Sequence, residues 1–408
     1  MNILIVKLSA VGDVIHTLPS LAVLRRCYPD ADIAWVVEEA AADLLAGHPD
    51  LNRVIVSGRK RWIKELRRGR IIAPLREMIS FIRDLRRRRY DLVIDFHGLL
   101  KSAVIVLLSG GKRKLGYNSL QELSGLFYNE KIPEEMGKHA VDRYLDFVRH
   151  VAGKSGAACL AATPEFRIAI GEKERRRTEA LLKEQAAEFS SEKDDDLIIS
   201  RQIVTPAPAS ARVNSAEVQN SSYPMDSRFR GNDKEYQYPP LSEVVNDRPR
   251  FVAVNPVAFW ETKLWEEEKF AELCDRLREE RGIGIVLTGG ESAPLERICR
   301  KMRTKAVNLG GRTTLRELAC IYREAALLIT TDSGPMHLAA AVGTPVVALF
   351  GPTDPARTGP WGPGHRIIRK GLSCSPCFRK RCETPRCMTD ISVEEVFTAV
   401  KEMLAGKE

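Results

Sequence analysis

The stretch NILIVKLSAVGDVIHTLP (residues 2–19) joins an apolar run to a helical pattern through a short turn that contains Gly12 and Asp13. The apolar residues of the run do not alternate with polar ones, which is typical of a strand in a parallel sheet that is buried on both faces. Similar runs are DIAWVVE (32–38), RVIVS (53–57) and DLVIDF (91–96), with helical patterns at 14–26 and 74–88 between them. The first 150 residues therefore predict a doubly wound α/β unit.

A second set of apolar runs begins at residue 251. It consists of FVAVNP (251–256), GIVLTGG (284–290), ALLITT (326–331) and PVVALF (345–350), again separated by helical patterns. The sequence thus predicts an α/β fold with two Rossmann-like, doubly wound domains.

The region between these two sets has a different composition. It contains DDD, TPAPASA and QNSSYPMDSRFRGND and shows little apolar periodicity. Such a segment cannot bury enough apolar surface to offset its ordering entropy. We expect an N-terminal domain over 1–184, a disordered linker or insertion over 185–250, and a C-terminal domain over 251–390. A cysteine-rich loop at 374–387 belongs to that domain, and a C-terminal helix follows at 391–408 and packs back across the interdomain region.

Charge is concentrated in one part of the chain. The 408 residues carry 63 Lys and Arg against 54 Asp and Glu, a formal net charge of +9. Residues 59–89 alone hold thirteen Lys or Arg and three Asp or Glu, a local balance of +10. The excess predicts an anionic partner that is met by one face of one domain. No apolar run approaches the roughly 18 residues needed to span a bilayer.

Gly12 and Asp13 follow the first predicted strand directly. Ligands of open α/β sheets bind at the carboxyl ends of the strands, so Asp13 is a candidate base that faces a cleft. The alternative is that Asp13 only caps the following helix. No GxGxxG motif occurs here, which argues against a dinucleotide-dependent dehydrogenase.

The stretch ITTDSGPMHLAAAVGTPVVALFGPTDP (329–355) carries a second candidate site. A strand ends at Asp332-Ser333-Gly334, and Pro335 suits the first turn of a helix, whose N-terminus favours an anion. His337 lies about one turn into that helix, where packing is the alternative to ligand binding. Lys263 follows the strand at 251–256 and offers a positive charge at the same sheet edge, or only a solvated side chain.

Taken in order, these motifs resemble the ADP-heptose:lipopolysaccharide heptosyltransferases, glycosyltransferase family 9. The resemblance covers nearly all of the chain outside 185–250. Its N-terminal motifs look most like the heptosyltransferase I subgroup. They are VKLSAVGDVIHTLP (6–19), WVVEE (35–39), RWIK (61–64), DFHGLLKSA (95–103) and SGLFYN (124–129).

The resemblance implies a GT-B fold, two Rossmann-like domains facing a central cleft, and roles for individual residues. Asp13 matches the base that deprotonates the acceptor hydroxyl, and Lys263 the lysine at the donor phosphates. The remaining positions match the two substrate sites: Gly12, Gly289, Gly290, Thr313, Asp332, Ser333, Gly334 and His337 on the donor side, and Lys7, Arg61, Trp62, Lys64 and His97 on the acceptor side.

Several positions depart from the family pattern. Lys60 stands in place of arginine, Ile63 in place of a basic residue, and His97 in place of glutamine. Ala258 and Phe259 replace small hydroxyl residues on the donor side. These changes affect which acceptor the site would bind and how it would contact the donor phosphates.

Four cysteines lie close together in CSPCFRKRCETPRC: Cys374, Cys377, Cys382 and Cys387. Four thiolates could form a tetrahedral structural zinc site, and a reduced loop or one disulfide is the alternative. The other five cysteines fit helix or core positions.

The sequence and the resemblance together predict an inverting enzyme that needs no cofactor for catalysis. It would move heptose from ADP-heptose to the Kdo residue of Kdo-lipid A, in the cytoplasm and peripherally on the anionic cytoplasmic face of the inner membrane. A heptose acceptor, as in heptosyltransferase II, is the alternative. A basic, zinc-containing nucleic-acid-binding protein is a third reading that leaves the GDV and DSGPMH motifs unexplained, so no nucleic-acid partner is expected.

Overall fold

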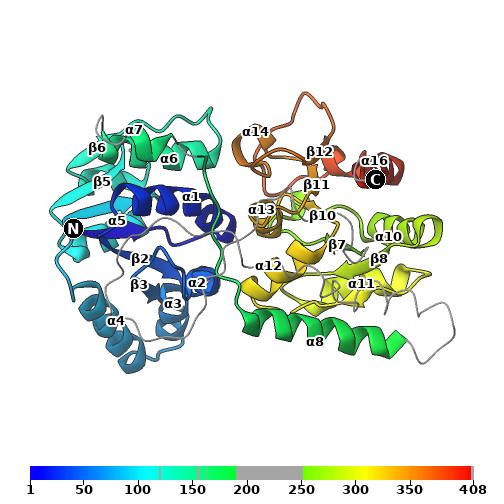
Figure 1. The fold of residues 1–408 in the computed structure, drawn as a ribbon, viewed down its shortest axis with the longest axis horizontal. Coiled ribbons are helices and arrows are strands. Elements are labelled where there is room, and N and C mark those ends of the chain that lie inside the picture. The colour runs from blue at the N-terminus through cyan, green and yellow to red at the C-terminus, as the bar shows by residue number, and fades with distance from the viewer. Residues whose placement is uncertain (119–120, 154–156, 162, 190–250, 406–408) are drawn as a thin grey trace, which may run out of the picture.

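A computed structural model describes residues 1–118, 121–153, 157–161, 163–189 and 251–405. It shows two α/β halves side by side, each built on a six-stranded parallel sheet with helices on both faces (Figure 1). The predicted doubly wound α/β class is confirmed. Most of the predicted segment 185–250 lies outside the described residues.

The N-terminal sheet has the strand order β3-β2-β1-β4-β5-β6. Its core strand β1 is buried from Ile3 to Val6, and β2 from Ile33 to Glu38, as their unbroken apolar runs predict. The strands are β1 (Asn2–Val6), β2 (Asp32–Glu38), β3 (Arg53–Ser57), β4 (Leu92–Asp95), β5 (Arg113–Tyr117) and β6 (Glu130–Ile132).

Helices of this half cover the two faces of the sheet. The helix α1 begins three residues earlier than the pattern at 14–26 predicts, because Gly12 and Asp13 belong to its first turn. The helices are α1 (Val11–Cys27), α2 (Glu39–Leu45), α3 (Arg59–Arg67), α4 (Ile72–Leu85), α5 (Leu100–Ser109), the 3₁₀ helix η1 (Gln121–Phe127), α6 (Ala140–Ala152) and α7 (Ala157–Leu160).

The C-terminal sheet repeats the same order, β12-β11-β10-β7-β8-β9. Its strands are β7 (Phe251–Asn255), β8 (Gly284–Leu287), β9 (Val307–Asn308), β10 (Leu327–Thr331), β11 (Val346–Phe350) and β12 (Arg366–Arg369). The intervening helices are the 3₁₀ helix η5 (Glu261–Lys263), α10 (Glu267–Arg281), α11 (Ser292–Lys301), α12 (Leu315–Glu324), α13 (Gly334–Ala341), α14 (Pro355–Thr358), α15 (Arg386–Thr389) and α16 (Val393–Ala405).

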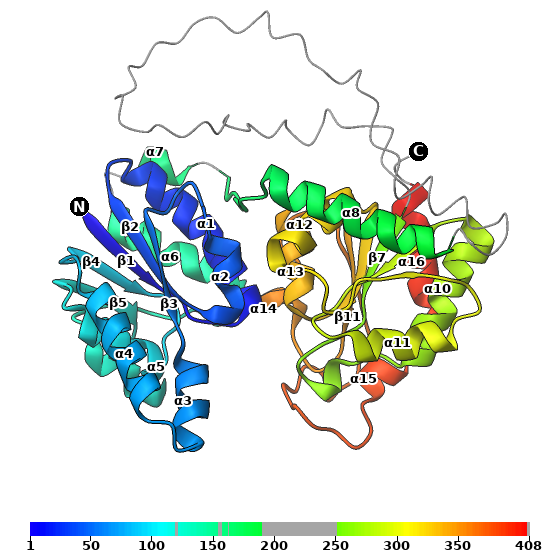
Figure 2. The same ribbon diagram turned by 90° about the horizontal axis from the view of Figure 1, so that it is seen from below.

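Helix α8 (Glu172–Phe189) crosses the predicted domain boundary at residue 184. It packs against α12 and β9 and lies along the C-terminal half in both views (Figures 1 and 2). Ion pairs from Arg312 to Glu184 (2.9 Å) and from Arg316 to Glu174 (3.0 Å) hold it there. Residues 172–184 therefore belong with the C-terminal half, and the expected assignment of this stretch to the N-terminal domain is wrong.

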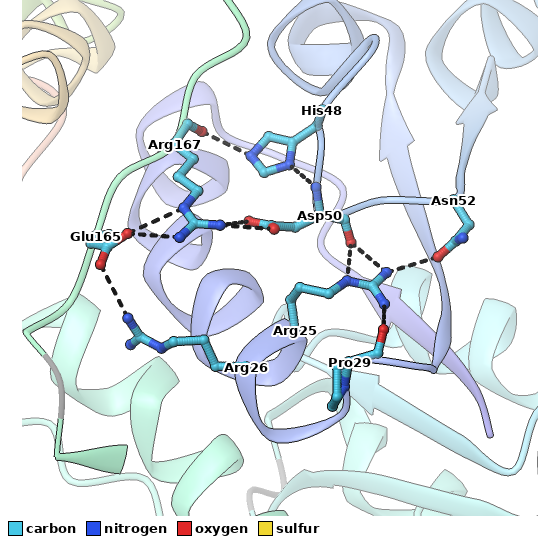
Figure 3. A network of polar contacts seen from close by, with 8 residues as sticks. All are labelled: Arg25, Arg26, Pro29, His48, Asp50, Asn52, Glu165 and Arg167. Atoms are coloured by element: carbon cyan, nitrogen blue, oxygen red, sulfur yellow. Dashed lines mark hydrogen bonds and ion pairs between the residues drawn. The ribbon is translucent and has the colours of Figure 1, made fainter. Parts of the chain in front are cut away.

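The chain reaches α8 through a segment that is fastened to the N-terminal half by a polar network (Figure 3). The Arg167 guanidinium binds the Asp50 carboxylate at 3.1 Å, and His48 Nε2 lies 2.8 Å from the Arg167 carbonyl oxygen. Glu165 joins Arg167 to Arg26 of α1. These contacts fix where the chain leaves the first half.

The last helix also differs from expectation. The sequence-based expectation places it across the interdomain region, but α16 packs against α10, β11 and β12 of its own half. Its apolar side chains Val396, Phe397 and Val400 belong to the C-terminal core. The expected interdomain role of this helix is therefore wrong.

Contacts between the two halves are made by other elements. Helix α1 packs against α13, and α2 against α12. Arg316 binds the Asp43 carboxylate, with Nε 3.3 Å from Oδ1, and His139 Nε2 lies 3.0 Å from the Gly359 carbonyl oxygen. None of the helices in the described part of the chain is both long enough and apolar enough to cross a membrane.

Candidate active site

The candidate site residues gather where the strand order reverses in each sheet. In the N-terminal half this is the edge after β1 and β4, and in the C-terminal half the edge after β7 and β10. Parallel sheets bind their ligands at such switch points. Asp13 and His97 follow the first pair of strands, and Lys263 and Asp332 follow the second pair.

Asp13 lies in the first turn of α1, and about 40% of its side chain is exposed. Its Oδ2 accepts a hydrogen bond from the Ala10 amide at 3.3 Å. Asp13 therefore does help to cap the N-terminus of α1, as the alternative to a catalytic role predicts. The Tyr144 hydroxyl lies 3.4 Å from Oδ1. The carboxylate thus combines a fixed position with an accessible surface, which a general base requires.

Lys7 is buried behind Asp13 rather than exposed to an acceptor, with 3% of the residue accessible. Its Nζ donates to the Tyr144 hydroxyl at 2.6 Å and to the Phe96 carbonyl at 3.1 Å, and lies 3.8 Å from Asp13 Oδ2. Burial lowers the pKa of Lys7, and the Asp13 charge opposes that shift. Lys7 is placed to act on Asp13 through Tyr144.

Gly12 leaves room for a histidine of the opposite half. A Cβ at this position would lie 2.5 Å from Cδ2 and 3.1 Å from Nε2 of His337. A Cβ on Gly334 would in turn lie 3.4 Å from the Val11 side chain. The N-termini of α1 and α13 therefore meet at the junction of the two halves.

His337 is buried in this junction together with His16 of α1. The distance from His16 Nε2 to His337 Nδ1 is 3.0 Å, and the His139 ring lies 5.3 Å from that of His16. Burial lowers the pKa of His337 to about 4, so the ring is neutral at pH 7.

Lys263 and Asp332 form an ion pair across the switch point of the C-terminal sheet. The distance from Lys263 Nζ to Asp332 Oδ2 is 2.6 Å, and the two side chains are 15% and 6% exposed. The Thr353 hydroxyl donates to the same oxygen at 2.6 Å, and Nζ stands 4.6 Å above the Trp260 ring. Ser333 is the N-cap of α13, but its hydroxyl lies 3.3 Å from that of Thr330 and makes no capping bond.

The loops after β8 and β9 form the outer part of the same edge. The Gly311 amide donates to the Gly289 carbonyl at 2.9 Å, and Gly289 is buried while Gly290 is exposed. Thr313 follows two residues later and is half-buried. The structure thus brings Gly289, Gly290 and Thr313 to neighbouring loops at this edge of the sheet.

The predicted acceptor residues are divided between two places. Arg61 binds the Glu39 and Glu77 carboxylates, and the buried Trp62 donates its Nε1–H to Glu77 at 2.7 Å. Lys64 is exposed on the same helix, α3. An anion that binds Arg61 must therefore compete with two carboxylates of the protein.

His97 lies apart from that helix, at the carboxyl end of β4. Burial lowers its pKa to about 2, with the charges of Lys7 and Lys101 acting in the same direction. Both of its ring nitrogens are buried and make no hydrogen bond of standard geometry within the described residues, although the Ser9 backbone acts on the ring. Such unpartnered groups are costly, so His97 is a candidate ligand contact.

The cysteines of the chain lie in several different environments. No three His, Cys, Asp or Glu side chains of the described residues are grouped to hold a metal ion. Cys374, Cys377 and Cys382 are exposed, while Cys387 is buried in the C-terminal core, and the zinc site suggested by their spacing stays a prediction. Cys27 and Cys159, expected to be small apolar residues, are joined in a disulfide between α1 and α7.

Sequence reasoning missed Tyr144 and His16, and it placed the loop of Thr353 in the candidate site without naming that residue. His16 lies one helical turn after Asp13 in GDVIH, a spacing that places both on one helix face and could have signalled it. Thr353 lies in the quoted stretch 329–355, in the loop after β11. Tyr144 reaches the site from a distant part of the chain, and no local motif marks it.

Comparisons with known proteins agree with this geometry. The family model described as glycosyltransferase family 9 (heptosyltransferase) matches residues 78–192 and 156–387. The chain is 30% identical to lipopolysaccharide heptosyltransferase 1 of Pseudomonas aeruginosa, over all of this chain and 99% of that protein. It is 27% identical to the Escherichia coli K12 protein of the same name, over 90% of this chain and 93% of that protein.

Solved structures show the same architecture. The E. coli heptosyltransferase WaaC with ADP superimposes with a TM-score of 0.67 at 23% identity, covering 99% of this chain and all of that chain. The E. coli ADP-heptose lipopolysaccharide heptosyltransferase II superimposes with a TM-score of 0.65 at 21% identity, covering 100% and 99%. The GT-B-like arrangement of two Rossmann-like halves is confirmed, and the chain belongs to glycosyltransferase family 9, the heptosyltransferases.

Proposed function

We propose that this heptosyltransferase moves heptose from ADP-heptose to the Kdo residue of Kdo-lipid A, in the inner core of lipopolysaccharide, with inversion at the anomeric carbon. One observation carries the proposal. An accessible carboxylate, Asp13, lies at the helix N-terminus of one half, directly against the donor-side helix α13 of the other half.

The C-terminal half supplies the donor site. Departure of ADP leaves negative charge on the diphosphate, and positive groups aimed at that charge lower the barrier. Lys263 and the N-terminus of α13 provide a cation and a helix dipole at one switch point. A relative of known structure has been solved with ADP-2-deoxy-2-fluoro heptose, which supports a donor of this class.

The N-terminal half supplies the base. In a single displacement the acceptor oxygen bonds to the anomeric carbon as the bond from that carbon to the phosphate oxygen breaks. Asp13 takes the acceptor proton, and ADP leaves with the bonding electron pair. Base catalysis of this kind contributes roughly 10²–10⁴-fold to the rate. The proposed chemistry requires no cofactor.

The acceptor would approach from the side of α3 and α4. These helices carry the basic run 59–89, and Figure 2 shows them together at one side of the N-terminal half. Ile71, Ile72, Leu75 and Ile79 are exposed there, and Ile72 is 85% accessible. Cations around exposed apolar side chains fit an anionic lipid surface. This supports peripheral attachment to the cytoplasmic face of the inner membrane.

A transfer assay with two acceptors tests the proposal. The purified chain is incubated with ADP-heptose and either Kdo-lipid A or heptosylated Kdo-lipid A, and the masses of the products are measured by mass spectrometry. We expect one heptose to be added to Kdo-lipid A and little to the heptosylated acceptor. Transfer only to the heptosylated acceptor would instead assign the heptosyltransferase II reaction.

A further inference from the structure

His16 and His337 form a buried pair that joins the two halves of the molecule. Their ring centroids are 4.1 Å apart, and His16 Nε2 lies 3.0 Å from His337 Nδ1. The exposed fractions of the two residues are 2% and 8%. A neutral imidazole carries one N–H and one bare nitrogen, so one ring donates and the other accepts.

The charges around the pair decide the direction of this hydrogen bond. On the side of the N-terminal half, the Lys7 ammonium and the Arg143 guanidinium act on His16. His337 is acted on by the carboxylate of Asp332 from its own half and by that of Asp13 from α1, against His139 and the charge of Lys263. Cations favour a bare nitrogen, and carboxylates favour an N–H.

The buried Nδ1 of His16 has no hydrogen-bond partner within the described residues. If His337 donated to His16, this atom would have to carry an unpaired proton in a region of positive charge. If His16 donates instead, Nδ1 is a lone pair that the cations stabilise. The second arrangement leaves the proton of His337 on its Nε2.

Nε2 of His337 lies at the edge of the ring that faces the N-terminus of α1. A Cβ on Gly12 would come within 3.1 Å of this atom, so the backbone of the base-bearing turn lies directly beside it. Nε2 makes no hydrogen bond to another described residue. An N–H at this place points to the junction where α1 and α13 meet.

We propose that His16 is a positioning residue for glycosyl transfer: it donates its Nε2–H to Nδ1 of His337 and so holds His337 as a neutral Nε2–H donor toward the departing diphosphate. The inference rests on the proposed function for the identity of that diphosphate. Fixing both the ring and its tautomer prepares the donor before charge develops. His16 itself touches neither substrate.

Nitrogen-15 NMR of the histidine rings tests the first half of this proposal. We expect His337 of the wild-type chain to show a bare Nδ1 and a protonated Nε2 at pH 7. The His16→Leu variant removes the hydrogen-bond partner of His337 Nδ1. The nitrogen signal of His337 Nδ1 should therefore shift toward that of a solvated or mobile ring. A wild-type His337 protonated at Nδ1 would overturn the proposal.

Steady-state kinetics test the second part of the proposal, the effect of His16 on glycosyl transfer. We expect His16→Leu to lower kcat by about tenfold to a hundredfold, since small misplacements of catalytic groups have effects of this size. His16→Gln, which retains an N–H near the same place, should recover most of kcat, and His150→Leu, on the surface of α6, should match the wild type. Thermal unfolding shows whether each variant is folded.

The outcomes separate this inference from the proposed function. A folded His16→Leu variant with kcat within twofold of the wild type would overturn the role of His16. A wild-type chain with the predicted tautomer that neither binds ADP nor transfers heptose would overturn the proposed function, and with it the role of His16 in transfer.

Discussion

Gly12 and His337 come from opposite halves of the molecule and approach so closely that no side chain fits between them. A Cβ on Gly12 would lie 2.5 Å from Cδ2 of His337. The glycine of the GDV motif is therefore explained by a contact between the halves and not by its own backbone angles. It brings the base-bearing turn of α1 directly against the donor-side helix α13.

Replacing Gly12 by alanine should separate this junction. Because both the His337 ring and the α1 backbone are packed, the new methyl group must displace one of them, at a cost of about 1–3 kcal/mol. We expect kcat to fall by about a hundredfold, since the base and the donor site move apart. The control is Gly137→Ala, where an added Cβ meets no atom within 4 Å. Equal kcat in the two variants would contradict this account.

Tyr144 should affect both stability and rate. In Tyr144→Phe the buried Lys7 ammonium loses its 2.6 Å acceptor, which destabilises the fold by about 1–3 kcal/mol. Asp13 loses a long hydrogen bond, so kcat should fall by about threefold to tenfold. Urea unfolding and steady-state kinetics measure the two effects. A variant as stable and active as the wild type would show that the Lys7–Tyr144–Asp13 chain has no role.

Lys263 should affect mainly the affinity of the enzyme for the donor nucleotide. We expect Lys263→Ala to weaken ADP binding by about tenfold to a hundredfold, because the proposed charge-assisted contact of this nearly buried ammonium with the diphosphate is lost. Lys380 lies over the same Trp260 ring, at 5.4 Å, and is exposed. Lys380→Ala is therefore a matched control that should change affinity by less than threefold. Isothermal titration with ADP measures both, and equal losses in the two variants would refute a specific role for Lys263.

Stability should decrease in mild acid. Burial lowers the pKa of His337 from 6.5 to about 4, so below pH 6.5 the unfolded chain binds a proton that the folded chain does not. The folded state should lose about 2 kcal/mol from this group between pH 7 and pH 5. The lowered pKa of His16 acts in the same direction.

Urea midpoints at the two pH values measure this loss. Carboxylates add to the acid sensitivity of the wild type, so the comparison is with His337→Gln, which should show a smaller decrease. The same decrease in both proteins would contradict the assignment to His337.

The sequence predicts those parts of the fold that local patterns determine. Strands β1 and β2 appear at their predicted places because unbroken apolar runs mark buried parallel strands. Strand β3 is also at its predicted place, but as a partly exposed edge strand. Strand β5, RKLGY, has no such run, since it begins with two charged residues and owes its place to pairing with β4 and β6. Helices α8 and α16 were assigned to the wrong neighbours because amphipathic patterns reveal an apolar face but not what covers it.

The residues of the candidate site also fall into those that local sequence patterns predict and those that they do not. Asp13, Lys263 and Asp332 follow strand ends in sequence, so the rule for parallel sheets locates them. Thr353 follows the end of β11, so the same rule places it beside Asp332. Tyr144 belongs to the site only through folding across 131 residues, to Asp13. The four clustered cysteines differ in burial although they are close along the chain, since Cys387 packs into the C-terminal core and the other three are exposed.

The assignment of Asp13 as the base opposite the donor site is tested most directly by Asp13→Asn. This variant keeps the shape of the side chain and removes its ability to take a proton, with Asp30→Asn as an exposed control. Transfer from ADP-heptose and ADP affinity are measured on the same preparations. We predict that transfer falls by about 10²–10⁴-fold while ADP affinity changes by less than threefold. A variant that retains more than a tenth of wild-type transfer would contradict the account.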